Sequence, residues 1–327
     1  MAGAAAPIRL RRVAVPAALV AGYAASVLFS VFISRMGGPT SSIWTATGFL
    51  AAALILLRGR MRLTVAAACL AIQAATSLGA GDDWVRLTVG PLLNLVEAVI
   101  AAWLGVAYCG AAGRRLSLRK VTLLIVGAIL PAAMLVALVG GAVNAISTGQ
   151  NFVEGWLAWA IPSGLGMAMV TPALLLVARE SQYKEFRRTP LEILGLIAGL
   201  CGFTFAVFYQ SELPLLFAVF PALTIVAFRL GPPGAAIGGF FVAVIALTLT
   251  TLGHGPTMLS AVLDPVGRVR LAQVLVTAAL FTTLATACVV ADESRLRRLL
   301  VNRDRAARAA RLRARAAERM AAEPMQR

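Results

Sequence analysis

The sequence predicts an all-α fold, a polytopic integral membrane helical bundle of about 8–10 transmembrane helices with both termini in the cytoplasm. Of 327 residues, 60% are hydrophobic and only 13% are charged, whereas soluble domains carry about 25% charged residues. Apolar runs near 20 residues recur along the chain, and short basic clusters separate them. This pattern excludes a disordered chain, a disulfide scaffold and an ordinary cytosolic enzyme.

Ten apolar segments are predicted to be helical, since a helix of about 20 residues spans one hydrocarbon thickness of about 30 Å. They cover about 13–34, 40–57, 63–80, 87–110, 121–145, 156–178, 190–210, 213–228, 232–252 and 269–291. The second and eighth segments are short, so eight full spans with two tilted or re-entrant segments is an open alternative. The sequence shows no convincing internal repeat.

The distribution of basic residues predicts the orientation, because cytoplasmic loops are enriched in Lys and Arg. With the N-terminus inside, the inner side receives 15 basic residues before the tail and the outer side receives 4. We therefore expect residues 1–12 to be a cytoplasmic N-terminus, 13–291 a multispan sensor-like membrane domain and 292–327 a basic cytoplasmic helical tail.

The tail holds 11 Arg against 5 acidic residues, with Ala and Leu as the other frequent residues. These are helix-forming residues, so the last span is expected to continue as one helix. Leu296, Leu299 and Arg303 fit a heptad register, but Arg313 falls on the same seam. A coiled coil, lipid binding and disorder all remain open for it. Nucleic-acid binding is disfavoured, because the basic excess of the chain mainly follows the membrane topology.

Polar residues inside apolar segments are the candidate functional residues, since an ionisable group at the bilayer centre costs about 2.5–3.5 kcal/mol. Glu97 is the only acid near the middle of a predicted span. Asn94 lies on the same helical face, where its amide is expected to hydrogen-bond the carboxyl group. Two interpretations stay open: a site for a ligand, proton or ion, and a protonated Glu97 that only links helices.

No catalytic signature is present. The chain has no Gly-Lys-Ser/Thr phosphate loop, paired-His zinc motif or nucleophile elbow. Its four cysteines (Cys69, Cys109, Cys201 and Cys288) show no metal-ligand spacing and are interpreted as small buried hydrophobic residues. We therefore expect a protein that is not an enzyme and that holds no metal or cofactor.

Six short motifs follow one another along the chain. They are Ser42 to Gly48, Asn94 to Ala98, Trp159 to Gly166 with Val170 to Pro172, Phe228 to Gly231, Gly253 to Pro256, and Gln273 at the start of the last span. In this order they resemble the bacterial membrane-associated sensor domain of the first type (MASE family), over roughly residues 13–298. That module is the multispan N-terminal sensor of diguanylate cyclases and histidine kinases.

The resemblance implies the candidate ligand or signal residues Trp44, Asn94, Glu97, Trp159, Ser163, Arg229, His254 and Gln273. Ser163 stands where the family has an acid, and Ala160 where it has a second Trp. If that acid helps to bind a signal in relatives, the signal site is expected to be altered or lost in this chain. The chain ends about thirty residues after the point where relatives attach a catalytic output domain, so that domain is expected to be missing.

The implied function is a signal-input module of the bacterial inner membrane that acts in trans on a cytoplasmic kinase or cyclase, with self-association left open. A small-molecule transporter or channel is the first alternative, because Glu97 and four prolines (Pro131, Pro162, Pro172 and Pro221) interrupt apolar segments. It ranks second because no repeat is visible. A membrane anchor or scaffold, with the basic tail bound to anionic lipid or to a partner, is the other alternative.

Overall fold

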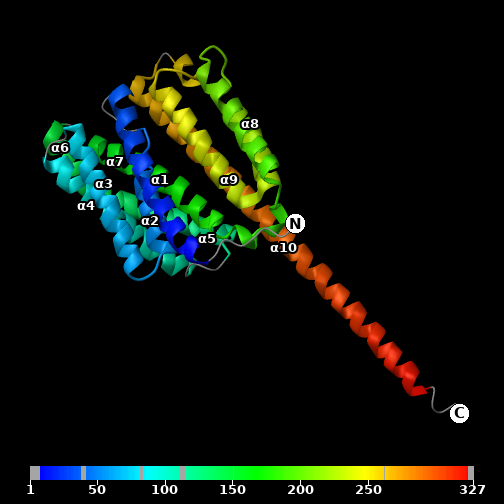
Figure 1. Cartoon of the computed structure of the whole chain (residues 1–327). Helices are drawn as coiled ribbons and strands as arrows, with labels where there is room; N and C mark the ends of the chain where they lie inside the picture. The colour runs from blue at the N-terminus through cyan, green and yellow to red at the C-terminus, as the bar shows by residue number, and fades with distance from the viewer. Residues whose placement is uncertain are drawn as a thin grey trace.

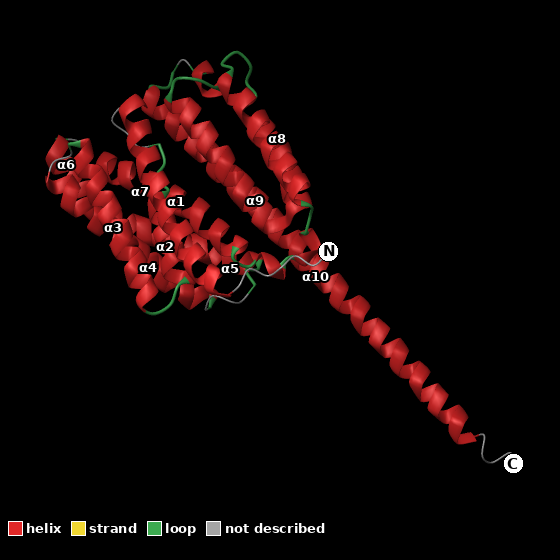
Figure 2. Ribbon diagram, viewed as in Figure 1, coloured by secondary structure: helices red, strands yellow, loops and turns green. Residues whose placement is uncertain are grey.

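A computed structural model describes residues 8–37, 42–81, 84–110, 115–149, 151–260 and 262–322, and the regular structure in these ranges is helical (Figure 2). The first helices are α1 (Ile8–Gly37), α2 (Ala46–Leu56), α3 (Arg60–Ala80) and α4 (Trp84–Cys109). One span then joins α5 (Leu118–Leu124), a π-helical turn (Ile125–Ile129) and α6 (Leu130–Thr148). The last helices are α7 (Phe152–Val177), α8 (Pro190–Tyr209), α9 (Val219–Thr251) and α10 (Pro265–Ala322).

Eight helical stretches of the described chain are long and apolar enough to cross a membrane. The multispan all-helical prediction is confirmed at that level. The second predicted segment is the 11-residue α2, about 16 Å long, which is half of the hydrocarbon thickness. The described residues therefore match the alternative of eight long apolar helices, accompanied by short helical segments, better than ten helices of equal length.

The eighth predicted segment is the first part of α9, which folds back on itself at Gly231. This glycine has φ 64° and ψ −162°, a non-helical conformation within the helix. A Cβ added at Gly238 would lie 3.0 Å from Leu223 and 3.4 Å from Val226, so the two parts run side by side. We call residues 219–230 the short arm of α9 and residues 232–251 the long arm.

The order of elements repeats within the chain. A long helix, a short helix, a glycine turn and two long helices form α1 to α4, and the same order recurs from α8 through both arms of α9 to α10. The two turns match, with φ 58° at Gly59 and φ 64° at Gly231, a region that glycine enters without steric cost. No repeat is visible in the sequence because the matching feature is the order and backbone geometry of the elements rather than side-chain identity.

α7 lies at the centre of the bundle, where it packs against α2, α6 and α9. Every residue from 162 to 173 is buried. Gly164 and Gly166 lie in this stretch, and their missing side chains let neighbouring elements approach closely. Two apolar cores meet at α7, one formed mainly with α1 to α6 and the other mainly with α8 to α10.

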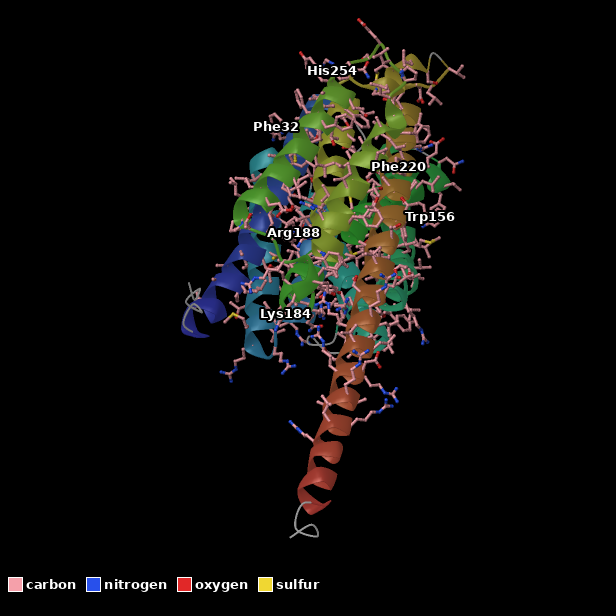
Figure 3. The ribbon with its side chains drawn as sticks, turned by 90° about the vertical axis from the view of Figure 1, so that its right-hand side faces the viewer. Phe32, Trp156, Lys184, Arg188, Phe220 and His254 are labelled. Atoms are coloured by element: carbon pink, nitrogen blue, oxygen red, sulfur yellow. The ribbon has the colours of Figure 1, made fainter. Side chains whose placement is uncertain are left out.

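The two ends of the bundle differ in charge. α10 continues unbroken for 58 residues and projects from one end, and α1 begins at this same end (Figure 1). Lys184 and Arg188 lie there, whereas His254 lies at the opposite end (Figure 3). We call the end with the projecting helix the arginine-rich end. Its composition supports the predicted orientation, in which this end faces the cytoplasm.

Candidate functional site

The centre of the candidate site is a carboxyl group enclosed between α4 and α7. Glu97 is 0% exposed, and its two oxygens lie 2.7 and 2.8 Å from Oγ of Ser163, which donates the hydrogen bond. Both residues lie near the middle of apolar helices, so water does not compete for the contact. The structure therefore joins two candidates that are 66 residues apart in sequence.

A second polar contact extends the site across α1, α3 and α4. The Oε1 atom of Gln73 accepts hydrogen bonds from Tyr23 Oη at 2.6 Å and from Asn94 Nδ2 at 3.1 Å. The expected bond from Asn94 to Glu97 is not formed among the described residues, because the Asn94 amide is directed to Gln73. Sequence reasoning missed Gln73 and Tyr23, although an amide within the third apolar segment was a signal that could have found Gln73.

The backbone of the segment before α2 packs against the middle of α7 and is hydrogen-bonded to it. Trp44 N donates to Pro162 O at 3.1 Å, one residue before Ser163. A Cβ at Gly166 would collide with the Trp44 carbonyl, so this glycine is what allows the close approach. Thr171 Oγ1 donates to Gly48 O at 3.1 Å on the next turns. These contacts fix the position of α7 on both sides of Ser163.

Two other aromatic and amide candidates flank this region. Gln273 on α10 is buried and donates from Nε2 to Ser42 O at 2.7 Å. It also lines, with Pro162 and Arg270, a cavity of about 30 Å³ between α7 and α10. The Trp159 indole packs against Gly140 of α6. The Nε1 atoms of Trp44 and Trp159 are buried without a hydrogen-bond partner among the described residues.

The remaining two candidates lie away from Glu97. Arg229, at the end of the short arm of α9, forms an ion pair with Glu192 of α8 at 2.8 Å. The His254 ring stacks on Tyr209 with a centroid separation of 5.3 Å, at the end opposite the arginine-rich end (Figure 3). Both contacts fasten turns between helices, and neither residue reaches the buried carboxyl group.

A second cluster, absent from the sequence analysis, holds α10 where it leaves the bundle. Arg115 Nη2 lies 3.1 Å from Glu185 Oε1 and donates to Ala291 O at 2.8 Å. Its Nη1 donates to Gln182 O at 2.9 Å, and its guanidinium carbon lies 4.6 Å from the centre of the Tyr183 ring. These five residues form the Arg115 cluster, which joins the segment after α4, the loop after α7, and α10.

Further contacts reinforce the Arg115 cluster. Glu185 also pairs with Arg298 of α10 at 3.4 Å, and Asp292 lies 3.8 Å from Arg115 Nε. Tyr183 Oη donates to Leu116 O at 2.8 Å. Burial raises the pKa of the Tyr183 phenol above its ordinary range, so this donor keeps its proton at cellular pH. One arginine thus ties together chain segments up to 176 residues apart in sequence.

The site offers hydrogen-bonding groups rather than metal ligands. Within the described ranges, no three His, Cys, Asp or Glu side chains come together as a metal site would require. All four cysteines are free thiols; Cys69, Cys109 and Cys288 are buried, and Cys201 is partly exposed. The chemistry available at Glu97 is therefore hydrogen bonding and charge.

Comparison with protein-family models finds a match that spans the candidate site and the Arg115 cluster. The MASE1 family model matches residues 13–297, nearly the whole chain. The chain belongs to the MASE1 family. The predicted resemblance is thus confirmed, and the match contains the eight candidate residues and the whole Arg115 cluster. No curated protein and no solved structure matches the chain.

MASE1 domains are multispan sensory domains of bacterial membranes and are not themselves catalytic. The membership places Glu97, Ser163 and α7 in a sensor module rather than in an enzyme. The matched region ends within α10 at residue 297, close to Ala291, where the Arg115 cluster contacts this helix.

Proposed function

We propose that this MASE1 domain senses a signal at the Glu97–Ser163 contact, transmits it through α7 to α10, and acts in trans on a cytoplasmic kinase or cyclase. The observation that carries the proposal is the placement of α7. This helix bears Ser163 in its buried middle and leads at its end into the loop that contributes Gln182, Tyr183 and Glu185 to the Arg115 cluster.

The distance between Ser163 and the loop that carries the Arg115 cluster can be bridged by one rigid helix, α7. From Ser163 to the end of α7 the axial rise is about 21 Å at 1.5 Å per residue. The Trp44 backbone holds the same helix at Pro162 through a hydrogen bond. A change in the Glu97 contact is therefore expected to move the remainder of α7 relative to this fixed point. Coupling of this kind requires two arrangements whose populations the signal shifts.

The surroundings of Glu97 favour a small signal. Glu97 is 0% exposed, so only a species as small as a proton or an ion reaches its carboxyl group without rearrangement of the helices. The cavity of about 30 Å³ beside Pro162 and Gln273 lies between α7 and α10 and is not lined by Glu97. The buried, unpartnered Oγ1 of Thr47 on α2 adds a hydrogen-bonding atom within the helices packed around α7. A proton or a small ion is the class of signal that these groups support.

Spin labels at the exposed positions Leu300 and Arg187 test the transmission step, because they report the position of α10 relative to the loop after α7. Glu97→Gln removes the titratable carboxyl group while keeping nearly the same shape, and it is expected to shift or broaden the distance distribution measured by electron paramagnetic resonance. Glu212→Gln, at an exposed acid of the α8–α9 loop, is the matched control. An unchanged distribution in Glu97→Gln, with the protein folded, would refute the transmission step.

Action in trans needs a separate experiment. The full chain is expected to capture a histidine kinase or a diguanylate cyclase from a lysate of its host, and truncation after Arg298 is expected to abolish this capture. If truncation leaves both the capture and every signalling phenotype unchanged, the projecting part of α10 is not the output.

A transporter is the second candidate, and the repeated order of elements now favours it more than the sequence did. Transporters are commonly built from repeats with a polar site in the membrane. This function predicts solute flux in proteoliposomes containing the protein, and loss of the flux in Glu97→Gln. Flux without any movement of α10 would favour the transporter over the sensor.

A further inference from the structure

An apolar groove runs between α1 and α3 on the surface of the bundle. It has a volume of about 450 Å³, and its walls include Val13, Ala17 and Ala21 of α1 and Met61 and Thr64 of α3. The groove exists because small side chains on α1 leave space that larger ones would fill. Val13 is 68% exposed and Met61 is 42% exposed at one end of the groove, and Ala17 and Ala21 are exposed further along it, so the groove is open to the surface.

The groove occupies one half of the membrane thickness. Its lining on α1 extends from Val13 to Ala24, an axial rise of about 17 Å, close to half of the 30 Å hydrocarbon core. It starts at the arginine-rich end, because α1 and α3 both begin there (Figure 1). An acyl chain from the leaflet on that side has the matching length and chemistry.

The mouth of the groove is basic and has no acidic residue nearby in the sequence. Residues 1–81 contain no Asp or Glu, while α1 begins with Arg9, Arg11 and Arg12 in its sequence. Arg58 in the turn before α3, and Arg60 and Arg62 in its first turn, are exposed, and none of the three forms an ion pair with a described carboxylate. Guanidinium groups bind phosphate through charge-assisted, bidentate hydrogen bonds.

We propose that an anionic phospholipid binds here, with one acyl chain in the α1–α3 groove and its phosphate at Arg60 and Arg62. Charge decides between this occupant and a second copy of the chain. A second copy packed through the same groove would bring the acid-free, arginine-rich start of its own α1 and α3 against this one, and like charges would repel. A lipid of the same leaflet supplies the opposite charge and the apolar chain together.

The test uses the purified full chain in nanodiscs, with phosphatidylglycerol compared against phosphatidylcholine and bound lipid counted by native mass spectrometry. The wild type is expected to retain phosphatidylglycerol selectively. The double variant Arg60→Gln/Arg62→Gln is expected to lose about thirtyfold in affinity, since each basic residue near an anionic surface contributes about fivefold. Arg119→Gln/Arg187→Gln removes the same charge from exposed positions at the same end and is expected to retain selectivity.

A second pair of variants tests the groove itself. Ala17→Leu/Ala21→Leu fills it without a change in charge and is expected to release the lipid, whereas Ala198→Leu on the exposed face of α8 is not. Equal loss in the two arginine pairs would show general attraction to charge and overturn the site. Retention in the filled variant would also overturn it, as would cross-linking between two copies through a cysteine at position 17.

Discussion

Arg115→Ala tests whether the Arg115 cluster holds α10 against the bundle. The substitution removes two hydrogen bonds to backbone carbonyls and the 3.1 Å ion pair with Glu185, whose side chain is 9% exposed. Removing one partner of a buried ion pair lowers the stability of a protein by about 3–5 kcal/mol. Glu185 keeps Arg298 as a partner at 3.4 Å, so the expected cost is at the lower limit, about 3 kcal/mol.

This cost should appear as local opening of α10 rather than as global unfolding. A change of about 3 kcal/mol corresponds to about a 150-fold increase in the opening equilibrium, which hydrogen exchange of peptides covering residues 286–298 would measure. Arg115→Lys keeps the charge but loses the planar fork, and should give an intermediate increase. The control Arg119→Ala changes a nearby exposed arginine and should leave the exchange as in the wild type. An increase below fivefold in Arg115→Ala, or an equal increase in peptides of α1 to α3, would refute the reasoning.

Three further substitutions test the packing of the bundle. Gly166→Ala places a methyl group against the Trp44 carbonyl and should destabilise the fold by about 1–3 kcal/mol in detergent unfolding, while Gly199→Ala, which faces open space, should be neutral or stabilising. Gln73→Leu leaves two buried donors without their acceptor and should cost about 1–3 kcal/mol by the same measurement, and a neutral result would show that these donors find other partners. Gly231→Ala forces a residue with a Cβ into φ 64° beside the Phe186 ring and should lower the thermal midpoint, and an unchanged midpoint would argue against the tight turn.

Much of the fold follows from the sequence because membrane helices are specified locally. Apolar length fixes each span, and the two short segments around 40–57 and 213–228 already suggested that two helices do not cross fully. The fold-back at Gly231 depends instead on one backbone conformation, which glycine permits but does not require. The repeat was hidden for the same reason.

The candidate site was predictable from the sequence only where placing a single residue inside the membrane has a high free-energy cost. Glu97 stood out because a carboxyl group in an apolar helix needs a partner, and Ser163 emerged from the family pattern. Arg115 did not stand out, because Lys and Arg are common in the cytoplasmic loops between spans and need no further explanation there. Its partners are distant in sequence, at Glu185 and Ala291, and only the folded chain brings them together.

The shortness of α2 has a consequence for how the protein is made. With 11 residues, α2 cannot be recognised as a spanning segment by its own length, yet α1 and α3 run in the same direction and require the chain to return between them (Figure 1). Its main support, α7, is synthesised about 100 residues later. Until then, we expect the positive charges of Arg58, Arg60 and Arg62 to hold the α2–α3 turn on the cytoplasmic side of the membrane. We therefore expect the early topology of the nascent chain to depend on these three charges until packing against α7 fixes the position of α2.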